Sequence, residues 1–306
     1  MGIRALISEK YKLDKTLNRG IEIMKILANV EMKNYSNMKI GGKAKELIFI
    51  EKEEELKEVL KTRDKVFLIG NGTNTLISDK DLDISFISLK EFNYMKVIEK
   101  NENYDIVCIG SGANLDDLID FMEANDYAGL ENITGIPGSV GGLVNMNGGA
   151  YGTEIFDCID KIKICDLDGN IKVFEKSELN YNYRTTDIKE NKWIVVEVYF
   201  KFSKGFDKEC SQDKKDKREE RHPLELPNLG STFKNPDQNF AAQLISDAGL
   251  KEYRVGNAMV SPKHPNFIVN LGEAGFEDVM GAIEHVKEII KEKNNIDLQT
   301  EIIIVK

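Results

Sequence analysis

Apolar positions recur along this chain in two patterns, and each pattern predicts a different kind of element. Short apolar runs, several of them alternating with polar residues, predict strands. These runs lie at 47–50, 65–70, 84–89, 94–98, 105–110, 161–166, 171–174 and 194–202. Apolar residues at helical spacing, with charges on the opposite side, predict helices. Such segments lie at 3–31, 51–61, 114–125, 241–250 and 276–295. This mixture predicts an α+β protein.

Glycine is concentrated in one loop, residues 135–152, which contains seven glycines in the sequence GIPGSVGGLVNMNGGAYG. Helix and strand interiors avoid such a density, because each glycine costs backbone entropy. A solvent-exposed flexible loop is the simpler interpretation, but Val140, Leu143 and Val144 are interleaved here and a linker would be polar. We therefore expect a packed loop whose backbone N–H groups lie against a ligand such as a diphosphate.

Two further glycine turns follow predicted strands. The first is Gly70-Asn71-Gly72-Thr73-Asn74, and the second is Gly110-Ser111-Gly112, with Asn114 expected as the N-cap of the helix after it. The second turn begins like a dinucleotide fingerprint, but the third glycine and the acidic residue about 20 positions on are missing. Together with the loop at 135–152, the two turns indicate an extended ligand that contains a pyrophosphate.

Composition narrows the class of protein. A length of 306 residues predicts two or three domains, and 41% hydrophobic with 31% charged residues is typical of a globular protein. No apolar run is long enough to span a membrane, and the first residues lack the features of a signal peptide, so we expect a cytoplasmic protein. A net charge of −10 disfavours nucleic acid as a partner.

The four cysteines do not predict a metal site or a disulfide framework. Cys108, Cys158, Cys165 and Cys210 form no CxxC pair and have no histidine at ligand spacing. Buried thiols are the expectation. Farther along, residues 203–221 are dominated by charge, which predicts a domain boundary that continues into a solvated helix.

Three polar residues stand out by their chemistry. Glu301 lies in an apolar strand, where a carboxylate must be paired or have its pKa raised by burial, unless the strand is an exposed edge. Arg184 is flanked by tyrosine and threonine, which suits a guanidinium that binds a carboxylate. A salt bridge at the end of a strand is the simpler interpretation. Ser231 follows a glycine, but the G-x-S-x-G motif of a hydrolase is absent, so a catalytic triad has no support.

The motifs taken together resemble a known family. IGNGTN, GIPGSVGG with NGGAYG, NYR, GSTFKNP, AAQLISDAGL, VSPKHPNFIVN and LQTEI occur in this order over residues 34–306. This combination is similar to the UDP-N-acetylenolpyruvoylglucosamine reductases of bacterial cell-wall synthesis. The similarity is greatest to their shorter subtype, because no long insertion occurs between Tyr151 and Phe202.

The resemblance implies a fold and a domain order. It implies the two-subdomain FAD-binding fold of the vanillyl-alcohol-oxidase type, followed by an α+β substrate-binding domain. We expect FAD-binding subdomains at residues 1–90 and 91–203 and the substrate-binding domain at 218–306. A monomer is expected, with no nucleic-acid or membrane partner.

The resemblance also implies a reaction in peptidoglycan precursor synthesis. NADPH reduces non-covalently bound FAD and leaves, and hydride then adds to the vinyl carbon of UDP-N-acetylenolpyruvoylglucosamine to give UDP-N-acetylmuramate. By resemblance, Arg184 and a protonated Glu301 stabilise the enolate that forms, and Ser231 delivers the proton to the carbon beside the carboxylate. A raised pKa of Glu301 is consistent with that role.

The remaining site residues follow from the same resemblance and from the glycine turns. FAD is expected to contact Gly70, Asn71, Gly72, Thr73, Asn74, Gly112, Pro137, Gly138, Ser139, Val140, Gly141, Gly142, Asn147 and Gly148. The substrate is expected to contact Tyr151, Tyr183, Arg218, Arg221, Lys234, Asn235 and Lys263. No metal ligand is predicted.

Other functions stay open on the residues alone. A flavin-dependent oxidase of small alcohols shares the implied fold, but its frequent histidyl attachment of the flavin is disfavoured because no histidine precedes His222. A non-catalytic protein that binds nucleotide sugars is disfavoured because Arg184, Ser231 and Glu301 are all present. An NAD-dependent dehydrogenase has the least support.

Overall fold

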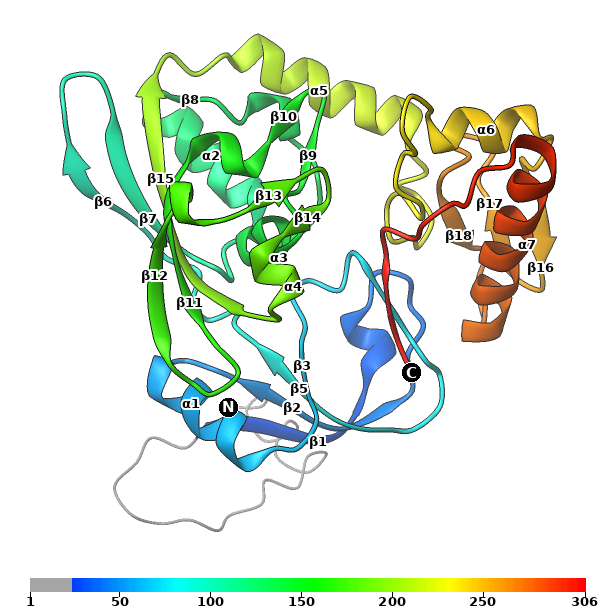
Figure 1. Ribbon diagram of the computed structural model, residues 1–306, viewed down its shortest axis with the longest axis horizontal. Coiled ribbons are helices and arrows are strands. Elements are labelled where there is room, and N and C mark those ends of the chain that lie inside the picture. Colours follow the sequence, from blue (N-terminus) through cyan, green and yellow to red (C-terminus); the bar gives the residue numbers. More distant parts are fainter. Residues whose placement is uncertain (1–23) are drawn as a thin grey trace, which may run out of the picture.

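The computed structural model describes residues 24–306, which fold into two larger parts, each built on a sheet, and a smaller part with a three-stranded sheet, joined to them by a long helix (Figure 1). The first part is a four-stranded mixed sheet with the strand order β1-β2-β5-β3. Its strands are β1 (Lys25–Glu31), β2 (Lys43–Phe49), β5 (Leu82–Ser88) and β3 (Val66–Leu68). Helix α1 (Glu53–Thr62) buries Leu56 and Val59, as its helical spacing predicts.

The second part is a six-stranded antiparallel sheet, in which β12, β11, β15, β7 and β6 follow one another and β8 pairs with β15. Its strands are β6 (Met95–Lys100), β7 (Asp105–Gly110), β8 (Tyr127–Ala128), β11 (Ile159–Cys165), β12 (Ile171–Glu175) and β15 (Ile194–Lys204). Strand β15 is the central strand and buries the alternating side chains that the sequence predicts. A hairpin joins β11 and β12 through Gly169, whose φ of 80° suits glycine.

Short elements connect the strands of the second part. The helices are α2 (Leu115–Ala124), α3 (Val140–Asn145) and α4 (Asp187–Glu190). The 3-10 turns are η2 (Glu131–Ile133), η3 (Ile155–Cys158) and η4 (Lys176–Glu178). In the first part, a further 3-10 turn, η1 (Met32–Tyr35), follows β1. Two small hairpins are formed by β9 (Gly149–Ala150) with β10 (Thr153–Glu154) and by β13 (Tyr181–Asn182) with β14 (Thr185–Thr186).

Helix α5 (Lys208–Arg221) connects the second part to the third, and Figure 1 shows it along one side of the molecule. It lies within the charged stretch in which the sequence predicts a boundary and a solvated helix. Beyond it, α6 (Ala241–Asp247) and α7 (Phe276–Asn294) accompany the antiparallel strands β16 (Arg254–Val255), β17 (Ala258–Val260) and β18 (Ile268–Asn270). The buried stripe of α7 contains Val279, Ile283, Val286 and Ile290, as its periodicity predicts.

The end of the chain returns to the first part. Strand β19 (Ile303–Val305) pairs in parallel with β4 (Thr75–Ile77), which follows the first glycine turn. Figure 1 shows this red segment crossing from α7 toward the blue strands. The pairing brings Glu301 close to the turn at 70–74, although more than 200 residues separate them in the sequence.

The parts share buried surfaces, so their relative positions are fixed by packing. One apolar cluster joins Ile48 and Ile87 of the first sheet to Val196 of β15. Another joins the third part to the first, because Met38 and Leu76 lie in the same core as α6 and α7. Burial of this kind contributes about 25 cal/mol for each Å² of apolar surface.

One expectation about local structure is wrong. Residues 25–31 form a strand and not a helix, because Lys25 to Glu31 pair antiparallel with β2, and this pairing outweighs the helical spacing. The rest of the predicted segment 3–31, up to residue 23, lies outside the described residues. Asn114 is the N-cap residue of α2, as expected, although its side chain makes no cap bond and instead accepts a hydrogen bond from Asn71.

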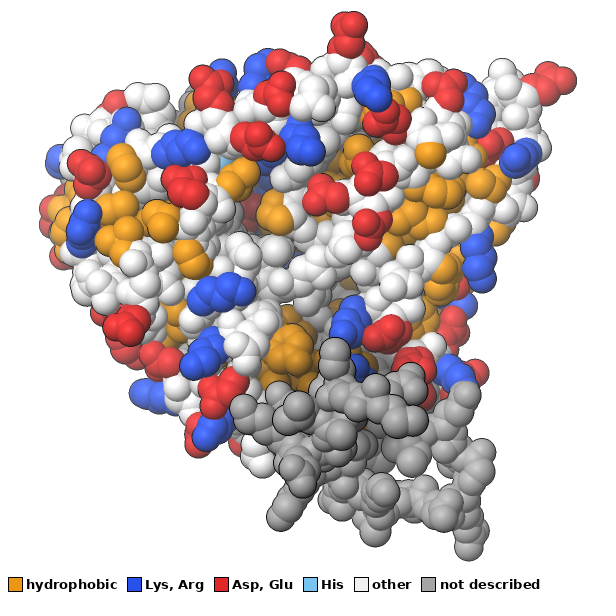
Figure 2. All heavy atoms as spheres, turned by 180° about the vertical axis from the view of Figure 1, so that it is seen from behind, with side chains coloured by type: hydrophobic (Ala, Val, Ile, Leu, Met, Phe, Trp, Pro, Cys, Tyr) orange, Lys and Arg blue, Asp and Glu red, His pale blue; other side chains and the backbone are white. Residues whose placement is uncertain are grey.

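The surface carries both positively and negatively charged side chains. Figure 2 shows Lys and Arg interspersed with Asp and Glu on the face opposite that of Figure 1, with hydrophobic side chains between them. A nucleic-acid backbone needs a continuous basic face, and this face offers none. Within residues 24–306, no helix combines the length and apolar composition that crossing a bilayer requires.

The close packing of the second glycine turn generates a stability prediction. A Cβ atom at Gly112 would lie 2.1 Å from the carbonyl oxygen of Leu89, which is backbone and cannot move aside cheaply. We expect Gly112→Ala to lower the free energy of unfolding by about 1–3 kcal/mol, the usual cost of overpacking. Gly142→Ala is the control, because its Cβ would meet only the Ser139 hydroxyl at 3.2 Å. Equal unfolding midpoints in urea for the two variants would contradict the prediction.

Candidate active site

One cavity of about 960 Å³ lies where the three parts meet. It is lined by the glycine turn at 70–74, by most of the loop at 135–151, by the C-terminal end of α5 and by the loop at 228–235. Arg184 and Glu301 also line it. A cavity of this size at a domain junction is a typical ligand site.

The three glycine-rich segments converge on one another. Asn114 and Ser139 form an isolated β-bridge, and Asn71 donates a hydrogen bond to Asn114 at 2.8 Å. The Thr73 hydroxyl donates to the carbonyl oxygen of Pro137 at 3.2 Å. The segments that the sequence suggests as one ligand site therefore form one surface.

The glycines have a structural role in addition to the expected one of bringing the backbone against a ligand. Several of them allow one turn to pack on another. A Cβ at Gly141 would lie 2.8 Å from the Cβ of Ser111, and one at Gly72 would lie 2.0 Å from the carbonyl oxygen of Tyr35. Gly138 differs, because a Cβ there meets nothing closer than 3.4 Å while its φ is 149°.

One orphaned polar atom lies in this surface, and a second lies in the wall behind it. The Ser111 hydroxyl and the Asn147 side-chain oxygen are buried without a hydrogen-bond partner among the described residues. Buried polar groups are almost always paired, so such atoms indicate a missing ligand or water. With the backbone N–H groups of the turns, they fit the phosphate, hydroxyl and amide groups of a dinucleotide such as FAD.

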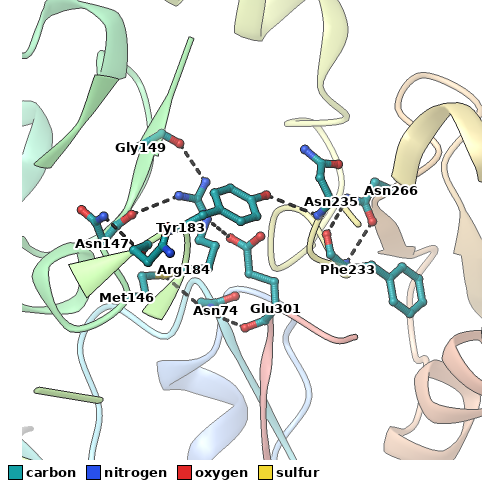
Figure 3. Close-up of polar contacts among 11 residues, drawn as sticks. Asn74, Met146, Asn147, Gly149, Tyr183, Arg184, Phe233, Asn235, Asn266 and Glu301 are labelled. Carbon is teal, nitrogen blue, oxygen red and sulfur yellow. Dashed lines mark hydrogen bonds and ion pairs between the residues drawn. The ribbon is translucent and has the colours of Figure 1, made fainter. Parts of the chain in front are cut away.

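Arg184 and Glu301, which both line the cavity, point toward each other (Figure 3). Arg184 Nε donates to Glu301 Oε1 at 2.8 Å, and its two Nη atoms donate to the carbonyl oxygens of Asn147 at 3.1 Å and Gly149 at 2.8 Å. The guanidinium also lies over the ring of Tyr183, with 4.9 Å from Cζ to the ring centroid. All of these contacts fix the guanidinium in one plane.

Glu301 is held in place by its backbone and is affected by burial. Its N–H donates to the carbonyl oxygen of Thr232 at 2.8 Å, and its own carbonyl oxygen accepts from Asn74 at 3.4 Å. Burial raises the pKa of Glu301 above its ordinary value, and the nearby cations Arg184, Lys189 and Lys234 oppose that rise. Desolvation is the larger effect, so the Glu301 carboxyl group keeps its proton to a higher pH than a solvated glutamate does.

Ser231 lines the same cavity, one residue before the Thr232 that binds the backbone of Glu301. The preceding Gly230 has a φ of 75°, a conformation that glycine adopts without strain. Thr232 N–H donates to the carbonyl oxygen of Asn266 at 2.7 Å, which ties this loop to the third part. The structure thus brings Ser231, Glu301 and Arg184 to one wall.

The residues expected to contact the substrate divide into two groups. Tyr151, Tyr183, Arg218, Arg221 and Asn235 line the cavity. The backbone N–H of Asn235 donates to the Tyr183 hydroxyl at 3.3 Å, as Figure 3 shows. Lys234 and Lys263 do not line the cavity. The Lys263 ammonium instead donates to the carbonyl oxygen of Glu219 at 2.8 Å.

Twelve of the fourteen residues expected to contact FAD line the cavity, and Val140 and Asn147 do not. Val140 lies in the apolar core of the second part. Asn147 is fully buried, with a φ of 47°, and donates to Glu154 Oε2 at 2.5 Å and to the carbonyl oxygen of Asn182 at 3.2 Å. It supports the wall behind Arg184, to which its carbonyl oxygen is bonded.

The sequence does not predict several of the residues that line the cavity. Lys189, Trp193 and Asn266 line the cavity, and no motif singles them out. His222 and His264 also line it, and their rings meet edge to face with 5.1 Å between the ring centroids. Among residues 24–306 no group of three His, Cys, Asp or Glu has a geometry that holds a metal ion, and the four cysteines are free thiols.

Comparisons with known proteins agree with this arrangement. Residues 222–305 match the family model described as UDP-N-acetylenolpyruvoylglucosamine reductase, C-terminal domain, and residues 44–175 match that of an FAD binding domain. A UDP-N-acetylenolpyruvoylglucosamine reductase of Fusobacterium nucleatum is 48% identical over 285 residues, which cover 92% of this chain and all of that protein. The chain belongs to the UDP-N-acetylenolpyruvoylglucosamine reductase family.

Other members of the UDP-N-acetylenolpyruvoylglucosamine reductase family extend the match. The protein of Clostridium novyi is 38% identical over 305 residues, 97% of each chain. The crystal structure of the Thermus caldophilus reductase superimposes with a TM-score of 0.79 at 31% identity and covers 93% of this chain and all of that one. The expected family and the expected fold class, an FAD-binding fold followed by an α+β domain, are confirmed.

The half-buried His222 at the end of α5 predicts a loss of stability in acid. Burial, together with His264 and nearby cations, lowers the pKa of His222 from 6.5 to about 4. Between these two pH values only the unfolded chain binds the proton, so stability is complete above pH 6.5 and falls as the pH is lowered toward 4. In the wild type, the free energy of unfolding should decrease between pH 7 and pH 5. We expect His222→Gln to make that decrease smaller by about 1–2 kcal/mol, measured by urea unfolding at the two pH values.

A matched control for this prediction is His285→Gln. His285 lies on α7, outside the cavity, and its ring stacks on that of Tyr253 with 4.0 Å between the ring centroids. The control is expected to keep the acid sensitivity of the wild type. An acid sensitivity of His222→Gln equal to that of the wild type would contradict the account.

Proposed function

We propose that the protein reduces UDP-N-acetylenolpyruvoylglucosamine to UDP-N-acetylmuramate, with NADPH as reductant and non-covalently bound FAD as cofactor, in peptidoglycan precursor synthesis. The observation that carries the proposal is the Arg184–Glu301 pair, which lines one cavity with Ser231 and the three glycine turns. Membership of the reductase family over nearly the whole chain supports it.

When bound, FAD would supply the chemistry of hydride transfer between NADPH and the vinyl carbon of the substrate. The turns at 70–74 and 111–112 and the loop at 137–148 would hold it, with the Ser111 hydroxyl as an additional donor or acceptor. We propose residues 1–90 and 91–203 as the two FAD-binding subdomains and 218–306 as the substrate-binding domain.

Arg184 supplies fixed positive charge to the substrate carboxylate. Two backbone carbonyl oxygens and Glu301 already orient its guanidinium, so little reorganisation is needed when negative charge develops as an enolate. Its backbone has a φ of 55°, which is uncommon for a residue other than glycine and often marks a functional site.

Glu301 acts in its protonated form. Burial favours the neutral carboxyl group. A protonated carboxyl donates one hydrogen bond while its other oxygen accepts from Arg184, so Oε1 keeps the contact with the guanidinium and Oε2 is directed to the enolate. This arrangement places two donors around one developing charge.

Ser231 delivers the proton to the carbon beside the carboxylate. It lies on the same wall as Glu301, and the Thr232 carbonyl links the two backbones. For the remainder of the substrate, we propose contacts with Tyr151, Tyr183, Arg218, Arg221 and Asn235, which all line the cavity, and a supporting charge from Lys234.

The two half-reactions test this function directly. We expect the purified FAD-loaded protein to lose its flavin absorbance when NADPH is added without oxygen and to regain it on addition of UDP-N-acetylenolpyruvoylglucosamine. We expect Ser231→Ala to keep the rate of reduction by NADPH while regain of the colour slows at least about 10²-fold, because the general acid is removed. Stopped-flow absorbance measures both rates.

Ser246→Ala is the matched control, because Ser246 lies on α6 and does not line the cavity. It is expected to behave as the wild type in both half-reactions. A Ser231→Ala variant that turns over the substrate normally would remove Ser231 from the mechanism, and a wild type whose reduced flavin ignores the substrate would overturn the proposed function.

A further inference from the structure

Tyr183 and Arg184 are neighbours in one tight turn. Strands β13 and β14 pair antiparallel, so these two residues form the turn between them. The Tyr183 N–H donates to Asn182 Oδ1 at 2.7 Å, which holds the beginning of the turn. Arg184 has a φ of 55°, and its guanidinium lies against the ring of Tyr183 with 4.9 Å from Cζ to the ring centroid. Both residues line the cavity, so the turn presents the ring and the guanidinium together.

The ring contacts a part of the Arg184 guanidinium that the hydrogen bonds do not hold. Glu301 and the carbonyl oxygens of Asn147 and Gly149 use three of its five N–H groups. N–H groups point outward in the plane of a guanidinium, so these bonds hold its edges. An aromatic ring on its face is a separate, cation–π contact that opposes tilting out of that plane. Two N–H groups are left by the described chain, enough for one carboxylate.

Tyr183 is itself held from the third part of the molecule. The Asn235 N–H donates to the Tyr183 hydroxyl at 3.3 Å (Figure 3). Asn235 Oδ1 accepts from the N–H of the first residue of α6 at 3.0 Å. The Lys234 N–H donates to the carbonyl oxygen of Gln299 at 2.9 Å, two residues before Glu301. The hydroxyl therefore ties the turn to a loop that is fixed both to α6 and to the segment that carries Glu301.

Burial separates the ring from the ion pair that it accompanies. The Arg184 and Glu301 side chains are 14% and 11% exposed, whereas Tyr183 is 40% exposed. A tyrosine with this exposure contributes little to the apolar core, so its replacement should leave the chain folded. The contacts of the ring with the guanidinium and of the hydroxyl with Asn235 then indicate what the residue does.

We propose that Tyr183 is a positioning residue, whose ring holds the Arg184 guanidinium in the orientation that meets the substrate carboxylate and whose hydroxyl holds the ring through the Asn235 N–H. The inference rests on the proposed function, because it takes the carboxylate from that substrate. Tyr183 transfers no proton in this scheme and acts through Arg184. This role is separate from its proposed contact with the substrate.

The two roles of Tyr183 differ in the ligands that its loss affects. A contact with the nucleotide or the sugar strengthens the binding of every nucleotide sugar that has those groups. A role through Arg184 strengthens only the binding of a ligand that carries the carboxylate. UDP-N-acetylmuramate carries this group, and UDP-N-acetylglucosamine has the same nucleotide and amino sugar without it.

Isothermal titration calorimetry of the FAD-loaded protein with these two ligands measures the difference apart from turnover. We expect Tyr183→Leu to weaken the binding of UDP-N-acetylmuramate at least about fivefold, the range of a partly desolvated cation–π contact. Binding of UDP-N-acetylglucosamine should change by less than about twofold. Tyr183→Phe keeps the ring and loses only the hydroxyl, so it should bind both ligands to within about twofold of the wild type.

A double-mutant cycle tests whether the effect passes through Arg184. Lysine has no planar face for the ring to hold. In the Arg184→Lys protein, adding Tyr183→Leu should therefore change the affinity for UDP-N-acetylmuramate by less than about twofold. In stopped flow, Tyr183→Leu should also slow reoxidation of the reduced flavin by the substrate. Reduction by NADPH forms no enolate and should stay within about twofold of the wild-type rate.

Tyr181→Leu is the matched control. Tyr181 lies on β13 of the same hairpin and is 39% exposed, but it does not line the cavity, and its ring stacks on that of Phe156 with 4.5 Å between the ring centroids. The control is expected to bind both ligands as the wild type does.

Four results would overturn the inference: unchanged affinities in Tyr183→Leu, an equal loss for both ligands, a full loss that persists in the Arg184→Lys protein, or a wild type with no preference for UDP-N-acetylmuramate. The proposed function fails in a different way. A wild type that shows this preference through Tyr183 but does not reduce the enolpyruvyl substrate would overturn the function and leave the role of Tyr183 standing.

Discussion

The ion pair between Arg184 and Glu301 is the contact on which the site depends. Arg184 follows the hairpin strand β13 in the second part, whereas Glu301 lies in the segment that returns from the third part to strand β4. Their 2.8 Å bond therefore joins segments 117 residues apart at the junction of all three parts. Because the Glu301 backbone is also bonded to Thr232, the pair and Ser231 form one rigid wall.

The glycine turns contribute to the same rigidity by a different route. Gly72, Gly112 and Gly141 permit backbone approaches that any side chain would block, so the turns form a continuous surface and not three separate loops. The buried hydroxyl of Ser111 and the side-chain oxygen of Asn147 then remain without partners in the described protein. A surface built in this way is ready for a polar ligand before the ligand arrives, which lowers the cost of binding.

Much of this arrangement follows from local patterns, and the rest depends on contacts over long sequence distances. Alternation predicts β15 and helical spacing predicts the buried stripe of α7, because each element buries one face. The same spacing fails at 25–31, where pairing with β2 decides the structure. Chemistry singles out Glu301 and Arg184, but their contact depends on the return of the chain through β19. Lys189 is one lysine among many until the fold places it in the lining of the same cavity.

The central claim is that Glu301 acts as a protonated donor held by Arg184. The most direct test is the pH dependence of flavin reoxidation by the substrate, measured by stopped flow in the wild type and in Glu301→Gln. Burial raises the pKa of Glu301, so the wild-type rate should be constant below that pKa and fall as the pH rises through it. Glutamine cannot lose a proton in this range, so the variant should be slower and lack this fall. The same pH profile in both proteins would contradict the claim.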